Sequence, residues 1–85
     1  MKKGTKIIKV EIATGGKTTA YTMDRNGNVA PLKLSYGQRK LFQSEYNDPD
    51  FKQDVAKEFG ADVLDEYFVI EKNGKQVYPP KEEDK

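Results

Sequence analysis

The chain has 85 residues, a net charge of +1, and neither cysteine nor histidine. This length allows a single domain, and 35% hydrophobic against 34% charged residues allows it only a small core. The missing residue types exclude disulfides, thiolate zinc sites, the commonest general base and the thiol nucleophile. We therefore expect no enzyme activity, no bound metal and no cofactor.

Residues 6–13 predict a strand, because apolar and charged side chains alternate there with the period of a half-buried sheet. Two-residue turns at residues 15–16 (Gly-Gly) and 26–27 (Asn-Gly) would connect it to two further strands. In this register Val10 lies opposite Tyr21. The sequence thus predicts a three-stranded meander.

The same register sorts the side chains of the meander onto two faces. The apolar face, expected to be covered, comprises Ile8, Val10, Ile12, Tyr21, Met23, Ala30, Leu32 and Leu34. The other face, expected to meet water, comprises Lys9, Glu11, Thr18, Thr22, Asp24 and Lys33. Two turns placed independently agree on this division, which favours it.

Two short helices are predicted after the meander. Ser35 followed by Gln38 matches a capping box, so one helix begins there. Asp48-Pro49 supplies a capping side chain and a proline suited to the first turn of a second helix, which Gly60 ends. Its apolar side consists of Phe51, Val55 and Phe59.

The C-terminal part predicts a hairpin. Residues 68–75 repeat the pattern of residues 21–28, and Asn73-Gly74 again predicts a two-residue turn. In this hairpin Ile70 lies opposite Val77, and the two prolines at 79 and 80 end the pairing. Residues 61–66 fit either a helical turn or the start of a strand.

The predicted fold class is α+β with an antiparallel sheet in the order β-β-β-α-α-β-β. A three-stranded meander carries two short helices on one face, and a β-hairpin follows. Residues 1–80 form the single domain, and residues 81–85 form a disordered polar tail. The expected core consists of Val10, Ile12, Tyr21, Leu32, Leu41, Phe42, Phe51, Val55, Phe59, Phe68 and Ile70.

Charge is divided unevenly along the chain. Residues 1–43 hold nine basic and two acidic residues, a net charge of +7, whereas residues 44–66 hold two basic and eight acidic residues, a net charge of −6. Such asymmetry indicates a charged interaction partner. No segment approaches the roughly 20 apolar residues of a membrane span, and no export segment is evident, so we expect a cytoplasmic location.

We accordingly expect a small protein-protein interaction module, of the size common among accessory and modulator proteins of bacteria and phages. Another protein is the expected partner, and the chain itself is expected to be a monomer or a weak homodimer. The candidate protein-binding residues recur every four positions on an acidic helical surface: Asp50, Asp54, Glu58 and Asp62. A helix face that is merely solvated explains the same spacing.

The alternative is a nucleic-acid-binding accessory domain that uses the basic N-terminal half. Its candidate residues are Lys9, Lys17, Lys33, Arg39 and Lys40. Nucleic-acid binders usually combine such charge with aromatic stacking or a recognition helix. The sequence places Tyr21 in the core and shows no motif of this kind, so protein binding is the preferred hypothesis.

Overall fold

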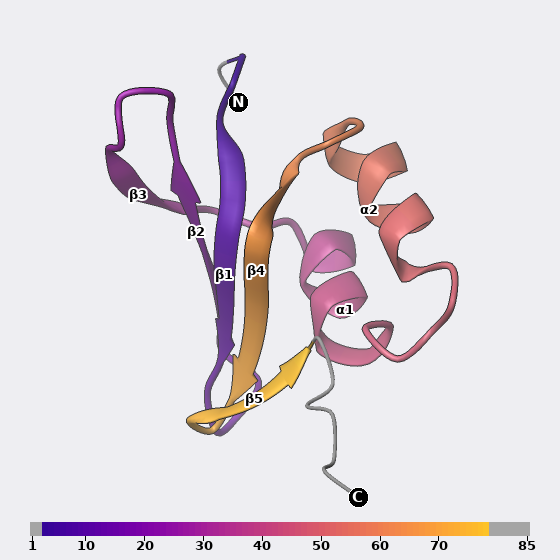
Figure 1. The fold of residues 1–85 in the computed structure, drawn as a ribbon. Coiled ribbons are helices and arrows are strands. Elements are labelled where there is room, and N and C mark those ends of the chain that lie inside the picture. Colours follow the sequence, from indigo (N-terminus) through magenta and orange to yellow (C-terminus); the bar gives the residue numbers. More distant parts are fainter. Residues whose placement is uncertain (1–2, 79–85) are drawn as a thin grey trace, which may run out of the picture.

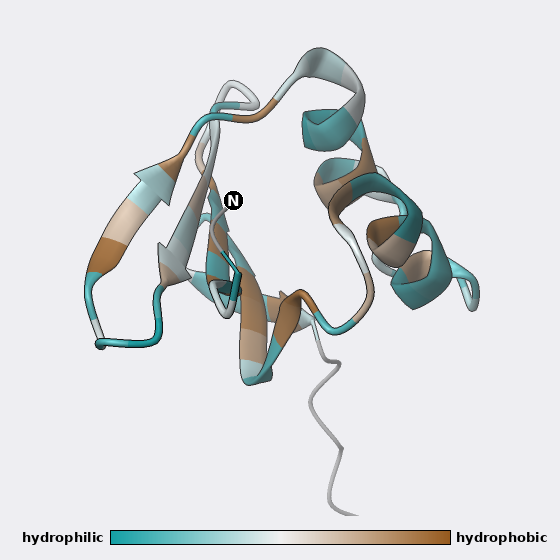
Figure 2. Cartoon of the chain, turned by 90° about the horizontal axis from the view of Figure 1, so that it is seen from above, coloured by the Kyte–Doolittle hydropathy of each residue, from teal (hydrophilic) through white to brown (hydrophobic). Residues whose placement is uncertain are grey.

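The computed structural model describes residues 3–78, which form a sheet with two helices on one of its faces (Figure 1). The elements in chain order are β1 (Lys6–Ile12), β2 (Thr18–Met23), β3 (Val29–Leu32), α1 (Tyr36–Ser44), α2 (Phe51–Phe59), β4 (Leu64–Lys72) and β5 (Lys75–Tyr78). The view from above in Figure 2 separates the sheet from the helices. The protein is therefore α+β, and the tail predicted at residues 81–85 lies outside the described residues.

The sheet is mixed, so the predicted antiparallel sheet is wrong. Its strand order is β3-β2-β1-β4-β5, and the central strands β1 and β4 run parallel to each other. Parallel neighbours need a long crossover connection, and here β2, β3 and both helices lie between the two strands in the chain (Figure 1). The N-terminal meander and the C-terminal hairpin thus join into one sheet along a pairing that no local sequence pattern specifies.

Both turns of the meander have three-residue loops, not the predicted two-residue ones. The Ala13 N–H donates to the Lys17 carbonyl over 2.8 Å, and the Asp24 N–H donates to the Asn28 carbonyl over 3.0 Å. Within the second loop only Gly27 has a positive φ, 86°, whereas a two-residue type I′ turn needs two such residues. Each extra loop residue shifts the strand register by one position.

The shift exchanges the faces of β2, because neighbouring residues of a strand point to opposite sides. Val10 lies opposite Ala20, and Ala20 lies opposite Leu32. Thr22 is buried on the helix side, where its hydroxyl donates to the Ala30 carbonyl over 3.2 Å. The predictions that Tyr21 is buried and that Thr22 meets water are therefore wrong.

Other members of the two predicted faces change sides for the same reason. Gln43 of α1 donates to the hydroxyl of Thr18 over 2.7 Å, so Thr18 also faces the helices, while Met23 is 37% exposed. A bulge between Ile7 and Lys9 changes the alternation in β1. Ile7 is consequently fully buried, and Ile8, which was expected on the apolar face, is only half-buried.

Local signals for the helices are largely confirmed. The Ser35 hydroxyl accepts from the Gln38 N–H over 3.2 Å, and the Gln38 side chain accepts from the Ser35 N–H over 2.9 Å, which is the predicted capping box. Gly60 ends α2, with a φ of 113°. The helix α2 begins two residues later than predicted, because the Asp48 carboxylate accepts from the Asp50 N–H over 2.8 Å in the turn before the helix.

The C-terminal hairpin has the predicted two-residue turn. Asn73 and Gly74 have φ values of 52° and 84°, as a type I′ turn requires. A bulge follows, so Ile70 lies opposite Tyr78 and not opposite Val77. Residues 61–66, which the sequence left open, form a turn and then the start of β4.

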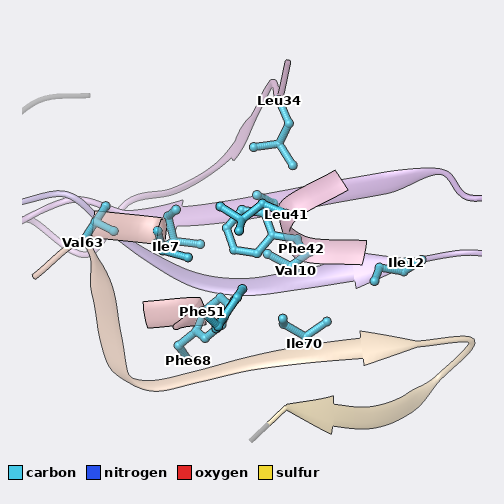
Figure 3. Packing of buried hydrophobic residues seen from close by; sticks show 12 residues of the cluster. Ile7, Val10, Ile12, Leu34, Leu41, Phe42, Phe51, Val63, Phe68 and Ile70 are labelled. Atoms are coloured by element: carbon cyan, nitrogen blue, oxygen red, sulfur yellow. The ribbon is translucent and has the colours of Figure 1, made fainter. Parts of the chain in front are cut away.

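The core lies between the helices and the sheet, with Phe42 of α1 at its centre (Figure 3). The centroid of the Phe42 ring lies 6.0 Å from that of Phe51, 5.8 Å from that of Phe59 and 6.1 Å from that of Phe68. The buried apolar residues are Ile7, Val10, Ile12, Ala20, Leu34, Leu41, Phe42, Phe51, Val55, Val63, Phe68 and Ile70. Leu32 and Phe59, both predicted to be buried, pack against this core and are half-buried.

Candidate functional site

A groove of about 650 Å³ runs between α2 and the first half of β4. This volume is within the roughly 300–1,000 Å³ range of sites that bind ligands. The groove is lined by Lys52, Gln53, Val55, Ala56, Gly60, Ala61, Asp62, Val63, Leu64, Asp65, Glu66, Phe68 and Tyr78. It is larger than two other pockets of the described residues, which have volumes of about 450 and 350 Å³.

The floor of the groove is apolar and continuous with the core. Val55, Val63 and Phe68 are buried core residues whose outer sides reach the groove, and Leu64 and Tyr78 pack against them. The Tyr78 ring lies 5.8 Å from that of Phe68 at one end. An apolar floor of this kind favours ligands that bring apolar side chains.

The rim of the groove is predominantly acidic. Asp62, Asp65 and Glu66 lie on the β4 side, whereas Lys52 is the one basic residue in the lining. None of these three carboxylates forms an ion pair with another described residue, since the ion pairs within residues 3–78 involve Lys9 alone. The rim can therefore attract a cationic ligand.

Three of the four acidic residues predicted to bind a protein belong to α2 or its N-cap, and the fourth follows the helix. Asp50, Asp54 and Glu58 lie at the start and along the length of α2, outside the groove lining, whereas Asp62 lies in the loop after Gly60 and on the rim. Because α2 ends at Phe59 and Gly60 has a φ of 113°, Asp62 does not continue the helix.

A second acidic group lies where α1 meets α2. Glu45 ends α1, and partial burial raises the pKa of its carboxyl above the ordinary value of 4.5. The protonated Glu45 carboxyl can donate a hydrogen bond to the Asp54 carboxylate, which raises this pKa further, as do the negative charges of Asp54 and Asp48. This group is a pair of adjacent carboxyls, and no set of three or more acidic residues among residues 3–78 could hold a metal ion.

The basic residues of the alternative hypothesis belong to several elements of the fold. Lys9 lies on the sheet face that the helices leave uncovered, and its Nζ is 3.0 Å from Glu11 Oε2 and 3.3 Å from Glu71 Oε1. These hydrogen bonds, first to Glu11 and then to Glu71, raise the pKa of Lys9. Lys17 lies in the β1–β2 loop and Lys33 follows β3, both exposed. The positive charge of Lys9 is thus already matched by carboxylates.

Arg39 and Lys40 do come together, around an exposed tyrosine. The Arg39 guanidinium lies 5.9 Å and the Lys40 ammonium 5.7 Å from the centre of the Tyr36 ring, which belongs to a side chain that is 69% exposed. Arg39 also donates to the Leu34 carbonyl over 2.9 Å, which holds its side chain in place. The first turns of α1 therefore present one aromatic ring with two cations beside it.

The sequence interpretation missed most of the groove. Glu66 continued the four-residue spacing of acids, but the apolar floor comes from residues in α2, β4 and β5 that only the tertiary structure joins. The signal that could have pointed to it was the run of acids directly after Gly60, beside residues that fit neither helix nor strand clearly.

No family model, no curated protein and no solved structure matched this chain. Within residues 3–78 no helix is long and apolar enough to cross a membrane. The function must therefore be argued from the geometry and chemistry of the surface.

Proposed function

We propose that the protein is a small non-catalytic module that binds a segment of another protein in the groove between α2 and β4. The observation that carries this proposal is the combination of an apolar floor with an acidic rim. A partner segment with apolar side chains and neighbouring lysine or arginine would satisfy both parts of the site.

The chemistry of the chain supports binding over catalysis. The sequence contains no histidine and no cysteine, and the carboxylates of the rim lie at the edge of an open groove. Binding of a flexible segment needs only apolar burial and charge complementarity, and this site offers both.

Affinity capture with three baits tests the proposal: the wild-type chain, Glu66→Lys and Glu58→Lys. Glu66 and Glu58 are both exposed acids, but Glu66 lies in the groove lining and Glu58 on α2 outside it. We expect a partner that the wild type and Glu58→Lys retain and Glu66→Lys loses, with the largest difference at low ionic strength.

Two results contradict the groove as the binding site. Loss of the partner with Glu58→Lys alone would transfer the site to the exposed side of α2, with Asp50 and Asp54. Equal retention by all three baits would mean that neither acidic surface contacts the partner.

The second candidate function is binding of single-stranded nucleic acid, which the cluster of Tyr36, Arg39 and Lys40 favours. An exposed aromatic ring can stack on a base while adjacent cations contact phosphates. The cluster is small, and Lys9 is matched by two carboxylates, so this function ranks below protein binding.

Titration of DNA and RNA oligonucleotides at low salt tests this second function. Binding would weaken steeply with added salt, and Tyr36→Ala would reduce it more than Tyr67→Ala, an equivalent change at another exposed tyrosine. Absence of binding at low salt removes the hypothesis.

A further inference from the structure

The first part of β4 has an open edge. β5 pairs with β4 only from Ile70 to Lys72, so β4 from Leu64 to Val69 has no described strand on its side away from β1. Figure 1 shows β5 beside only the end of β4 next to their turn. The edge that remains open adjoins the groove, since Leu64, Glu66 and Phe68 belong to its lining.

Most residues of this segment have no paired residue in β1. Ile7 lies opposite Leu64 and Lys9 lies opposite Val69, so Ile8 alone faces residues 65–68. The Tyr67 N–H donates instead to the carboxylate of Asp65 over 2.9 Å. This backbone donor is therefore satisfied within β4 itself and by no neighbouring strand.

The other edges of the sheet are protected against pairing. β3 has four residues and contains Pro31, and β5 has four residues and begins at Lys75. Short strands, proline and lysine all discourage edge-to-edge association. The first part of β4 is therefore the edge most open to an incoming strand.

We propose that an extended segment of a partner protein adds to this edge as a further strand, between β4 and α2. This inference rests on the proposed function and specifies its binding mode. Backbone hydrogen bonds to β4 would supply affinity, and alternate side chains would reach the apolar floor beside Val55 and Phe68.

Charge indicates which occupant fits. The rim carboxylates Asp62, Asp65 and Glu66 favour a segment that carries lysine or arginine between its apolar residues. A second copy paired through the same edge would bring these acids against each other. The chain's own residues 79–85 begin with two prolines, which have no N–H, and include three acids. A basic segment of another protein is thus the favoured occupant.

Selection from a displayed library of random peptides of roughly ten residues, enough to span the edge at ~3.3 Å per residue, provides the probe. The wild-type chain is the target, and Glu66→Lys is used for counter-selection. We expect peptides that alternate apolar residues with lysine or arginine. One of them is then synthesised in two forms, with backbone N-methyl groups on its odd or on its even residues.

Strand addition predicts that only one N-methylated form loses affinity, by at least about tenfold, because alternate residues point their N–H groups at β4. Equal affinities of the two forms would overturn strand addition while leaving peptide binding in the groove, and hence the proposed function, intact. A selection that yields no peptide sensitive to Glu66→Lys overturns both. Two results would overturn a partner segment as the occupant. One is peptide affinity that rises more than about tenfold when residues 79–85 are deleted, and the other is a dimer of the chain that the peptide dissociates.

Discussion

The ammonium of Lys9 on β1 lies 3.3 Å from a carboxylate oxygen of Glu71 on β4. The two residues are separated by most of the chain, and they meet only because β1 and β4 pair in parallel at the centre of the sheet. Glu11, on the same strand as Lys9, completes the group at 3.0 Å. This ion-pair group therefore marks the pairing that joins the two halves of the fold.

The ion pairs of Lys9 should make the free energy of unfolding fall at alkaline pH. Because the native state raises the pKa of Lys9 above 10.5, its stabilisation is complete below that pH and is lost as the pH rises through the raised value. We expect Lys9→Met to cost less than about 1 kcal/mol, since ion pairs at the surface contribute little, and to reduce this loss of stability at alkaline pH. Urea unfolding on either side of pH 10.5 measures both effects.

Lys33→Met is the matched control, because Lys33 is exposed and forms no ion pair with a described residue. Lys33→Met should lose as much stability at alkaline pH as the wild type does. If Lys9→Met and Lys33→Met behave alike, the Lys9 pairs contribute nothing to the native state.

The core around Phe42 predicts graded effects of truncation. Phe51 is 1% exposed and contacts Phe42, so Phe51→Ala should lower the free energy of unfolding by about 3–5 kcal/mol. Phe59→Ala should cost less, because Phe59 is half-buried. Tyr67→Ala, at a side chain that is 78% exposed, should change stability by less than about 0.5 kcal/mol. Chemical denaturation measures the loss of stability in the three variants. A different order of these losses would contradict the position of α2.

The loop between β2 and β3 depends on Asp24. Its carboxylate accepts from the N–H groups of Asn26 and Asn28, each over 2.9 Å, and from the Asn28 side chain over 3.2 Å. Asp24→Ala should therefore cost about 1–2 kcal/mol, whereas Asp24→Asn keeps an acceptor and should cost less. Thermal unfolding of both variants tests the three-residue loop, and equal losses would show that the side-chain acceptor does not hold it.

The adjacent carboxyls of Glu45 and Asp54 predict a dependence on acidic pH. The native state raises the pKa of Glu45 above 4.5, so it binds a proton more readily than the unfolded chain. The contribution of this group to stability should then fall as the pH rises through the raised value. Glu45→Gln should remove this dependence of stability on pH and should be at least as stable as the wild type at neutral pH.

Glu58→Gln is the control for Glu45→Gln, because it removes one exposed negative charge from α2 without touching the carboxyl pair. Urea unfolding across the acidic range compares the two variants. If the stability of Glu45→Gln still falls with rising pH as in the wild type, other groups cause the pH dependence.

Short-range signals in the sequence correctly predicted the features that depend on neighbouring residues alone. The Ser35–Gln38 capping box, the end of α2 at Gly60 and the Asn73-Gly74 turn each involve residues at most three positions apart. Their φ angles and hydrogen bonds follow from local chemistry, and the burial of Phe51 and Val55 follows from helical periodicity. The α+β class follows from these elements together.

The tertiary structure alone decided how the elements pair. Gly15-Gly16 and Asn26-Gly27 are compatible with loops of two or three residues, and one residue of difference moves Tyr21 from the core face to the uncovered face. The parallel pairing of β1 with β4 depends on the free energy of burying Val10 and Ile70 together under the helices, a long-range term that no local pattern encodes. The groove between α2 and β4 exists only as a consequence of that pairing, so its residues could not be assembled from the sequence.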